Sequence, residues 1–149
     1  MSRAPFQVLV LPFRHIQGGQ LEYAVFKRRD EGYWQFIAGG GENNEEPIET
    51  ARREACEEAG IAPDSEYIIL DSRNTMPVEG VTGDFTWGKD VYVIPEYTFG
   101  VGCDSEDISL SREHTECRWV CYEDAVAMLQ WDSNKNALWE LNARISRKT

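Results

Sequence analysis

Residues 39–61 restrict the fold of this chain more than any other segment, and they read GGGENNEEPIETARREACEEAGI. Pro47 suits the first turn of a helix, where its missing N–H costs nothing. Gly60 suits the left-handed position that commonly ends a helix. We therefore predict a helix over residues 47–59 that is entered from a run of glycines.

This helix is expected to have a packing face and an acidic face. At about 100° per residue, the packing face is apolar and made mostly of alanines: Ile48, Ala51, Ala55 and Ala59. Such small side chains would let the helix lie close against a sheet. Glu54, Glu57 and Glu58 are spaced i, i+3 and i+4 and share a different face. We expect all three carboxylates to point outward from the packed helix.

The crowding of acids needs a physical explanation, because many glutamates lie close together along residues 42–58: Glu42, Glu45, Glu46, Glu49, Glu54, Glu57 and Glu58. Like charges one helical turn apart destabilise a helix by about 0.2–0.5 kcal/mol per pair, and a bound cation would reverse that sign. Oxygen ligands without histidine or thiol suit Mg²⁺, and also Mn²⁺. A solvated acidic face is the alternative explanation.

Two neighbours of the acids favour a ligand site over a solvated face. The glycines before the helix would let the backbone approach a ligand closely. Arg53 adjoins the acids and could pair with Glu45, which would pin the loop to the helix. An acidic loop, a glycine-rich approach and a helical face with three acids together indicate a metal–phosphate site.

Composition and charge restrict the class of protein. The chain has 149 residues, which favours a single domain over residues 1–149. Apolar residues make up 42% and aromatic residues 11%, which is enough for a folded core. The net charge of −11 disfavours a nucleic acid polymer or an anionic membrane as partner. No segment approaches the roughly 18 apolar residues of a membrane span, and the N-terminal apolar run is too short for a signal peptide, so we expect a cytoplasmic protein.

The cysteines predict no special chemistry. Their number and spacing do not match a disulfide framework: Cys56, Cys103, Cys117 and Cys121. No second pair of ligands completes a zinc site around His114. Cys117, Trp119 and Cys121 alternate, as expected for one buried face of a strand.

Hydrophobic periodicity predicts a mixture of strands and helices. Residues 6–15 and 21–29 form a hairpin around a Gly-Gly turn. Further strands are predicted over 33–39, 66–74, 90–99 and 116–122, and further helices over 122–130 and 133–145. The irregular residues 76–90 and 100–114 are expected to be functional loops. The prediction is an α+β fold, with a mixed sheet flanked by helices.

Residues 39–61 resemble the signature of the Nudix hydrolases, G-x5-E-x7-R-E-U-x-E-E-x-G-U, where U is a bulky aliphatic residue. The matching residues are Gly39, Glu45, Arg53, Glu54, Ala55, Glu57, Glu58, Gly60 and Ile61. Ala55 is smaller than the usual aliphatic residue. The resemblance implies the α/β/α sandwich of that family and hydrolysis of a nucleoside diphosphate linked to another moiety.

The resemblance also implies roles for the acids. In the family, the glutamates of R-E-U-x-E-E bind divalent cations, which assigns metal contact and catalysis to Glu54, Glu57 and Glu58. Glu54 would position or deprotonate the water, and the Gly39 carbonyl would add a ligand. The expected cations, Mg²⁺ or Mn²⁺, would bridge the carboxylates and an anionic diphosphate that they would otherwise repel.

Three more stretches are similar to the dihydroneopterin triphosphate pyrophosphohydrolase branch of the family: KRRDEGYWQFIAG, REHTECRWV and WDSNKNALWEL. This likeness implies a further catalytic and metal-site carboxylate at Glu113. It implies phosphate contact by Arg28, or by Arg29 because a one-residue gap shifts the match. Arg3 matches a basic residue near the N-terminus.

Each of these residues also has a structural alternative. Glu113 and His114 could cap the following strand, and Arg28 and Arg29 could be a solvated strand end. Trp34 could stack on a base or pterin ring, as could Trp87 and Trp131, or these rings could belong to the core.

The resulting expectation is a Mg²⁺-dependent enzyme that cleaves a nucleoside or pterin triphosphate to the monophosphate and pyrophosphate. A dinucleoside polyphosphate hydrolase of the Ap4A type is the alternative enzyme. A nucleotide-binding module without hydrolysis and an acidic cation-binding protein remain possible as well. The sequence leaves open the attacked phosphorus, the catalytic base, the number of metal ions, and whether the protein is a monomer or a homodimer.

Overall fold

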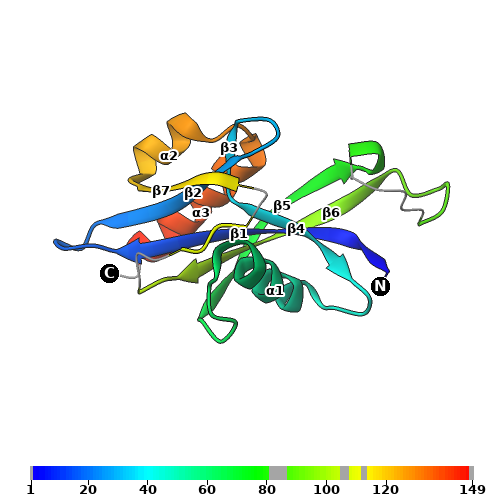
Figure 1. Ribbon diagram of the computed structural model, residues 1–149, viewed down its shortest axis with the longest axis horizontal. Coiled ribbons are helices and arrows are strands. Elements are labelled where there is room, and N and C mark those ends of the chain that lie inside the picture. Colours follow the sequence, from blue (N-terminus) through cyan, green and yellow to red (C-terminus); the bar gives the residue numbers. More distant parts are fainter. Residues whose placement is uncertain (1, 81–86, 105–107, 112–113, 148–149) are drawn as a thin grey trace.

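Helices cover both faces of one sheet in this protein (Figure 1). The computed structural model describes residues 2–80, 87–104, 108–111 and 114–147. Within these ranges the strands are β1 (Arg3–His15), β2 (Leu21–Arg28), β3 (Trp34–Gln35), β4 (Ile37–Glu42), β5 (Tyr67–Pro77), β6 (Val93–Gly102) and β7 (His114–Val120). The helices there are α1 (Pro47–Ala59), α2 (Tyr122–Met128) and α3 (Asp132–Arg147), with a 3₁₀ helix, η1 (Val78–Gly80).

Strand β1 is central to a mixed sheet that has seven strands within the described residues. The main order is β3-β2-β1-β6-β5, while β4 pairs with β1 and β7 pairs with β2. β1 runs parallel to β6 and antiparallel to β2 and β4. The predicted α+β fold, a mixed sheet flanked by helices, is therefore confirmed.

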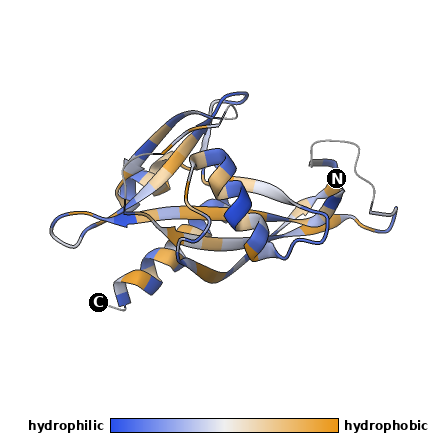
Figure 2. Ribbon diagram, turned by 60° about the horizontal axis from the view of Figure 1, so that its bottom comes forward, coloured by the Kyte–Doolittle hydropathy of each residue, from blue (hydrophilic) through white to orange (hydrophobic). Residues whose placement is uncertain are grey.

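Alternating residues of β1 supply both layers of the core. Leu9, Leu11 and Phe13 pack with α2 and α3 on one face. Val8 and Val10 pack with α1 on the other face. In Figure 2, hydrophobic stretches run along the strands inside the sandwich, while α1 carries long hydrophilic stretches. One strand thus holds the two helical layers together.

The bounds of α1 agree with the prediction. Pro47 lies in the first turn, and Gly60 ends the helix in the left-handed conformation with a φ of 70°. The Gly60 N–H donates to the carbonyls at the end of the helix. Ala51 and Ala55 are completely buried against the sheet, so the alanine packing face is confirmed.

The structure changes the bounds of several other elements. The strand predicted over 33–39 is two strands, and β4 continues through the glycines to Glu42 because backbone hydrogen bonds to β1 need no side chain. β5 extends to Pro77 and η1 follows it, in a region expected to be irregular. None of the described helices is long and apolar enough to span a membrane.

The prediction that Cys121 shares a buried strand face with Cys117 and Trp119 was wrong. β7 ends at Val120, and Cys121 is exposed immediately before α2. Cys117 and Trp119 do pack against the α1 layer of the core. The chain turns into α2 at Cys121, so strand alternation no longer applies there.

Candidate functional site

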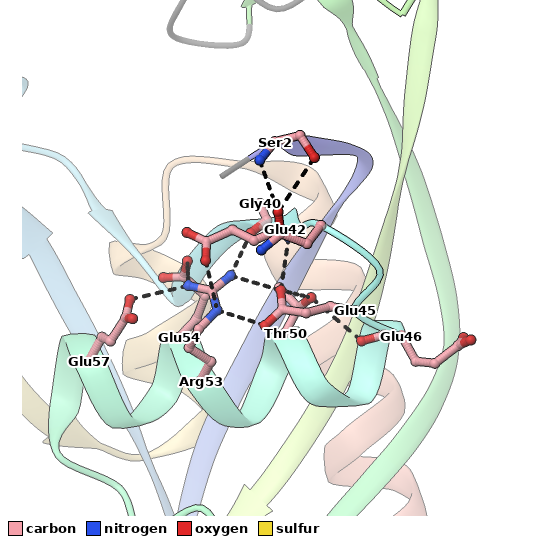
Figure 3. Close-up of polar contacts among 10 residues, drawn as sticks. Ser2, Gly40, Glu42, Glu45, Glu46, Thr50, Arg53, Glu54 and Glu57 are labelled. Carbon is pink, nitrogen blue, oxygen red and sulfur yellow. Dashed lines mark hydrogen bonds and ion pairs between the residues drawn. The ribbon is translucent and has the colours of Figure 1, made fainter.

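Arg53 joins α1 to the loop and to the glycine strand (Figure 3). Its Nε donates to Glu45 Oε2 at 2.8 Å, and its Nη2 donates to Glu45 Oε1 at 3.0 Å. Nη2 also donates to the Gly40 carbonyl at 2.9 Å. Glu45 accepts further hydrogen bonds from the Glu42 N–H and the Thr50 hydroxyl, each at 2.8 Å. The loop before α1 is therefore fixed to the helix, as the sequence suggested for Glu45 and Arg53.

The second edge of the Arg53 guanidinium faces two of the acids on α1. Nη1 lies 3.0 Å from Glu54 Oε1 and 3.2 Å from Glu57 Oε2. The hydrogen bond from Arg53 is the main cause that lowers the pKa of Glu45 to about 2. The hydrogen bond to Glu45 is in turn the main cause that raises the pKa of Arg53. The loop and helix are thus joined by groups that stay charged at neutral pH.

Glycines in β4 allow charged side chains to lie directly on the strand. A Cβ atom at position 39 would collide with the Glu54 carboxylate, and one at position 40 would collide with the Arg3 guanidinium. Arg3 also donates to Gln7 Oε1 at 3.1 Å. Burial lowers the pKa of Arg3, and the negative charge of Glu54 counteracts this. Arg3 therefore lies beside the glycine strand.

The expectation that all three helical acids point outward was wrong for Glu58. The side chain of Glu57 is 58% exposed and that of Glu54 is 14% exposed, whereas Glu58 is only 4% exposed. Ser109 and Ser111 donate backbone hydrogen bonds to the carbonyls of Ala59 and Glu58. This segment therefore packs over the C-terminal end of α1, where Glu58 lies.

The donor set fits a hard divalent cation. The side chains of Glu54, Glu57 and Glu58 and the Gly39 carbonyl offer only oxygen, which suits Mg²⁺ or Mn²⁺. The contact between Glu54 and Gly39 brings a carboxylate against the backbone of the glycine strand. Within the described part of the chain, no three Asp, Glu, His or Cys side chains lie close enough together to hold a metal ion. Arg53 Nη1 lies between the carboxylates of Glu54 and Glu57.

Two more of the predicted residues, Arg28 and Arg29, lie at the end of β2 and just after it. Glu113 falls outside the described residues. Arg28 ends β2 opposite His114 and pairs with Asp30 at 2.9 Å, and the hydrogen bond from Arg28 is the main cause that lowers the pKa of Asp30 to about 2. Arg29 is exposed. His114 is buried, with its ring 5.3 Å from that of Phe26, which is the environment of a core histidine.

The tryptophans differ in their surroundings. Trp34 packs partly buried against the α2–α3 core, with the Arg118 guanidinium 5.2 Å above its ring. Trp131 is 45% exposed and forms a T-shaped contact with the Tyr33 ring. The indole N–H of Trp87 donates to the Arg3 carbonyl at 2.8 Å, which places Trp87 next to the site.

Sequence reasoning missed Thr50 and Gln7, which contact Glu45 and Arg3. Thr50 has a local signal, since a hydroxyl in the first turn of a helix can bond to the preceding loop. Gln7 has none, because only the pairing of β1 with β4 brings it to Gly40.

The chain is similar to known proteins over most of its length. A NUDIX domain matches residues 13–140. A Listeria monocytogenes protein assigned to the NUDIX hydrolases is 44% identical, with 97% of each chain covered and a TM-score of 0.87. A curated relative from Roseobacter denitrificans, named RNA pyrophosphohydrolase, is 29% identical over 82% of this chain and 85% of the relative.

Two solved structures at lower identity share the fold. One is the Escherichia coli dihydroneopterin triphosphate pyrophosphohydrolase, at 21% identity and a TM-score of 0.72 over 95% of this chain and 99% of the other. The other is a Caenorhabditis elegans Ap4A hydrolase, at 20% identity and a TM-score of 0.70 over 97% of this chain and 99% of the other. Because both are equally similar, the fold does not select between the substrates in their names.

Proposed function

Because the chain belongs to the NUDIX domain family, we propose that it is a Mg²⁺-dependent pyrophosphohydrolase that cleaves a nucleoside or pterin triphosphate to the monophosphate and pyrophosphate. Membership makes the chain a hydrolase of phosphoanhydride bonds. The metal ion and the substrate class are the parts proposed. The observation that carries them is the Arg53 network, in which one guanidinium contacts Glu54, Glu57 and the glycine strand.

The site residues have complementary roles in this proposal. Glu54, Glu57, Glu58 and the Gly39 carbonyl would hold the cation. When bound, the cation polarises phosphoryl oxygens and lowers the pKa of water. Glu54 lies against Gly39, where its carboxylate can orient a water molecule or accept its proton. Mn²⁺ offers the same chemistry with the same donors.

Basic residues would hold the phosphate chain. Arg3 lies against Gly40, close to the acids, and its charge can compensate the phosphate oxygens as charge develops on them. Arg28 or Arg29 at the end of β2 would contact the far phosphates. Glu113 stays a proposed additional carboxylate, and Trp34 a proposed stacking platform.

Two of the similar proteins are named after other substrates, which gives two alternatives for this chain. The Ap4A hydrolase favours a dinucleoside polyphosphate, and the curated RNA pyrophosphohydrolase favours RNA. The net charge of −11 disfavours the polymer, because the RNA backbone would be repelled outside the metal site.

A substrate panel with Mg²⁺ tests the proposal. It contains dihydroneopterin triphosphate, deoxynucleoside triphosphates, ADP-ribose, diadenosine tetraphosphate and triphosphorylated RNA. We expect pyrophosphate and a monophosphate from a small triphosphate. ATP plus AMP from diadenosine tetraphosphate as the main reaction would instead identify a dinucleoside polyphosphate hydrolase. Binding without any product would indicate a nucleotide-binding module.

Glu57→Gln tests the assignment of the acids. We expect turnover to fall by about 100-fold or more, while the free energy of unfolding changes by less than about 0.5 kcal/mol because the side chain is exposed. Glu123→Gln, an exposed helical glutamate on α2, is the matched control. Near-normal turnover of Glu57→Gln would remove Glu57 from the site.

A further inference from the structure

A cavity of about 400 Å³ lies between α1 and the outer strands β5 and β6, and the proposed reaction uses none of its residues. Its walls are mainly apolar, with Ile48 from α1, Ile69 from β5 and Phe99 from β6. Ile69 is 62% exposed although it belongs to this concave wall. Binding sites for small molecules are typically apolar hollows of about 300–1,000 Å³. The cavity therefore has the size and the character of a ligand site.

The cavity lies on the same face of the sheet as the acids of α1, but on the other flank of that helix. Gly39, Val8 and Tyr97 are laterally in register on β4, β1 and β6. Glu54 lies against Gly39, and Tyr97 lines the cavity. Val8, between them, packs beneath α1. The helix therefore separates a ligand in the cavity from the acids, so this is a second site.

Arg73 on β5 brings positive charge to the cavity. Its guanidinium lies 5.0 Å from the centre of the Tyr97 ring, and its Nη1 donates to the carbonyls of Leu70 and Ser72 at 2.8 and 3.0 Å. Among the described residues Arg73 forms no ion pair, although the chain has 26 acidic residues. The backbone and the ring thus hold the guanidinium in place, while its other nitrogens can donate to a carboxylate or phosphate.

Glu46 is the second charged residue of the cavity lining. It is the N-cap residue of α1, and Figure 3 shows its side chain pointing away from the Arg53 network. A carboxylate accepts hydrogen bonds from N–H groups and repels anions. The cavity therefore combines apolar walls with one cation and one acceptor, which suits a ring that carries an N–H group and an anionic substituent.

We propose that this cavity binds a small molecule that consists of a flat ring with an N–H donor and one carboxylate or phosphate group. The ring lies between Ile48 and Ile69, the anionic group pairs with Arg73, and the N–H donates to Glu46. Nucleoside monophosphates and indole carboxylates are two sources of this chemistry. Because the helix separates the cavity from the acids, the inference does not depend on the proposed function.

Isoleucine methyl NMR in EDTA tests the inference on the full chain, because Ile48 and Ile69 line the cavity while Ile68 packs on the opposite face of the sheet. The probes are guanosine monophosphate and indole-3-acetate. Guanosine and indole-3-acetamide lack the anionic group, and phosphate and acetate lack the ring. We expect at least one probe to shift Ile48 and Ile69 but not Ile68, with a Kd about 10-fold or more below those of its neutral and ring-free analogues.

Three outcomes of this titration overturn the inference. One is that neither probe shifts the methyl groups of Ile48 and Ile69, and another is that the neutral analogues bind as tightly as the probes. The third is that these methyl groups shift on dilution without any ligand, since a second copy of the chain would then cover the cavity. The probe that binds more tightly identifies the source of the ligand.

Arg73→Gln tests the role of the cation. Arg73 is exposed, so the variant should fold, and we expect the Kd of the bound probe to rise about 10-fold or more while turnover of any triphosphate stays unchanged. Arg147→Gln is the matched control, because Arg147 is also an exposed arginine stacked on an aromatic ring, that of Trp139. An unchanged Kd in Arg73→Gln overturns the inference. A protein that binds the probe but cleaves no triphosphate would refute the proposed function alone.

Discussion

Arg53 connects the loop, the glycine strand and the acids of the candidate site with a single side chain. Two of its nitrogens bind Glu45, one of these also binds the Gly40 carbonyl, and the third nitrogen faces Glu54 and Glu57. A planar guanidinium with five donors can satisfy these partners together, whereas a lysine ammonium cannot. The charge balance of the site therefore depends on the shape of this residue as well as on its charge.

Arg53→Lys is expected to lower stability by about 1–3 kcal/mol, because hydrogen bonds to charged partners are lost in a half-buried place, and to lower turnover through the displaced Glu54. Urea unfolding and steady-state kinetics measure the two effects. Arg147→Lys serves as control, since Arg147 is exposed in the last turn of α3, away from the Arg53 network. Wild-type stability and turnover in Arg53→Lys would show that a point charge suffices.

Among the elements, the joint between α3 and β5 departs from regular pairing. The register of β5 shifts between Ile69 and Arg73, and Glu140 of α3 accepts the freed N–H groups of Asp71 and Ser72, each at 2.7 Å. Burial pushes the pKa of Glu140 upward, but these hydrogen bonds and one from Arg144 outweigh it and lower the pKa to about 2. An irregularity in the strand thus becomes the docking point of a helix.

Glu140→Gln is expected to cost about 1–3 kcal/mol of unfolding free energy at pH 7. The folded pKa lies below the ordinary value of 4.5, so this contribution is complete above pH 4.5 and is lost as the pH falls toward 2. The difference between wild type and variant should therefore shrink between pH 5 and pH 3 in urea unfolding. A difference that stays constant over this range would mean that the charge of Glu140 contributes nothing.

Over the whole molecule, the sheet brings together groups from distant parts of the chain. The acids belong to α1 on one face, while Gln7, Glu96 and Asn74 are in register and point to the other face. The glycine strand β4 and the N-terminal residue Arg3 connect the two faces at one edge. A ligand bound to the acids and to Arg3 would therefore contact the helix, the glycine strand and the N-terminal strand together.

Thermal unfolding measures how much such a ligand stabilises the fold. A ligand at 100 times its Kd adds about 2.7 kcal/mol, which corresponds to a rise in Tm of about 5–10 °C for a domain of this size. We expect Mg²⁺ with a non-hydrolysable triphosphate to raise Tm more than either alone, relative to EDTA. The rise should be smaller in Glu57→Gln, and an identical rise in both proteins would locate the ligand elsewhere.

The amino-acid sequence by itself determined α1, its caps, its alanine face and the spacing of its acids. These features arise from contacts within one or two helical turns, so residues near one another in the chain are sufficient to specify them. The ion pair of Arg53 with Glu45 was foreseeable for the same reason, since a short loop separates the two residues. The mixed sheet followed from hydrophobic periodicity, although the ends of its strands did not.

Only the tertiary structure decided which acids are exposed and what surrounds them. Glu58 is buried, and Ser109 and Ser111, much later in the chain, bond to the end of α1 where it lies. Arg3 meets Gly40, and Glu96 meets Gln7 and Asn74, through the register of strands that are far apart in sequence. Periodicity within a strand says which residues share a face, but it does not say which residue of another strand lies opposite, because that is set by the packing of the whole sheet.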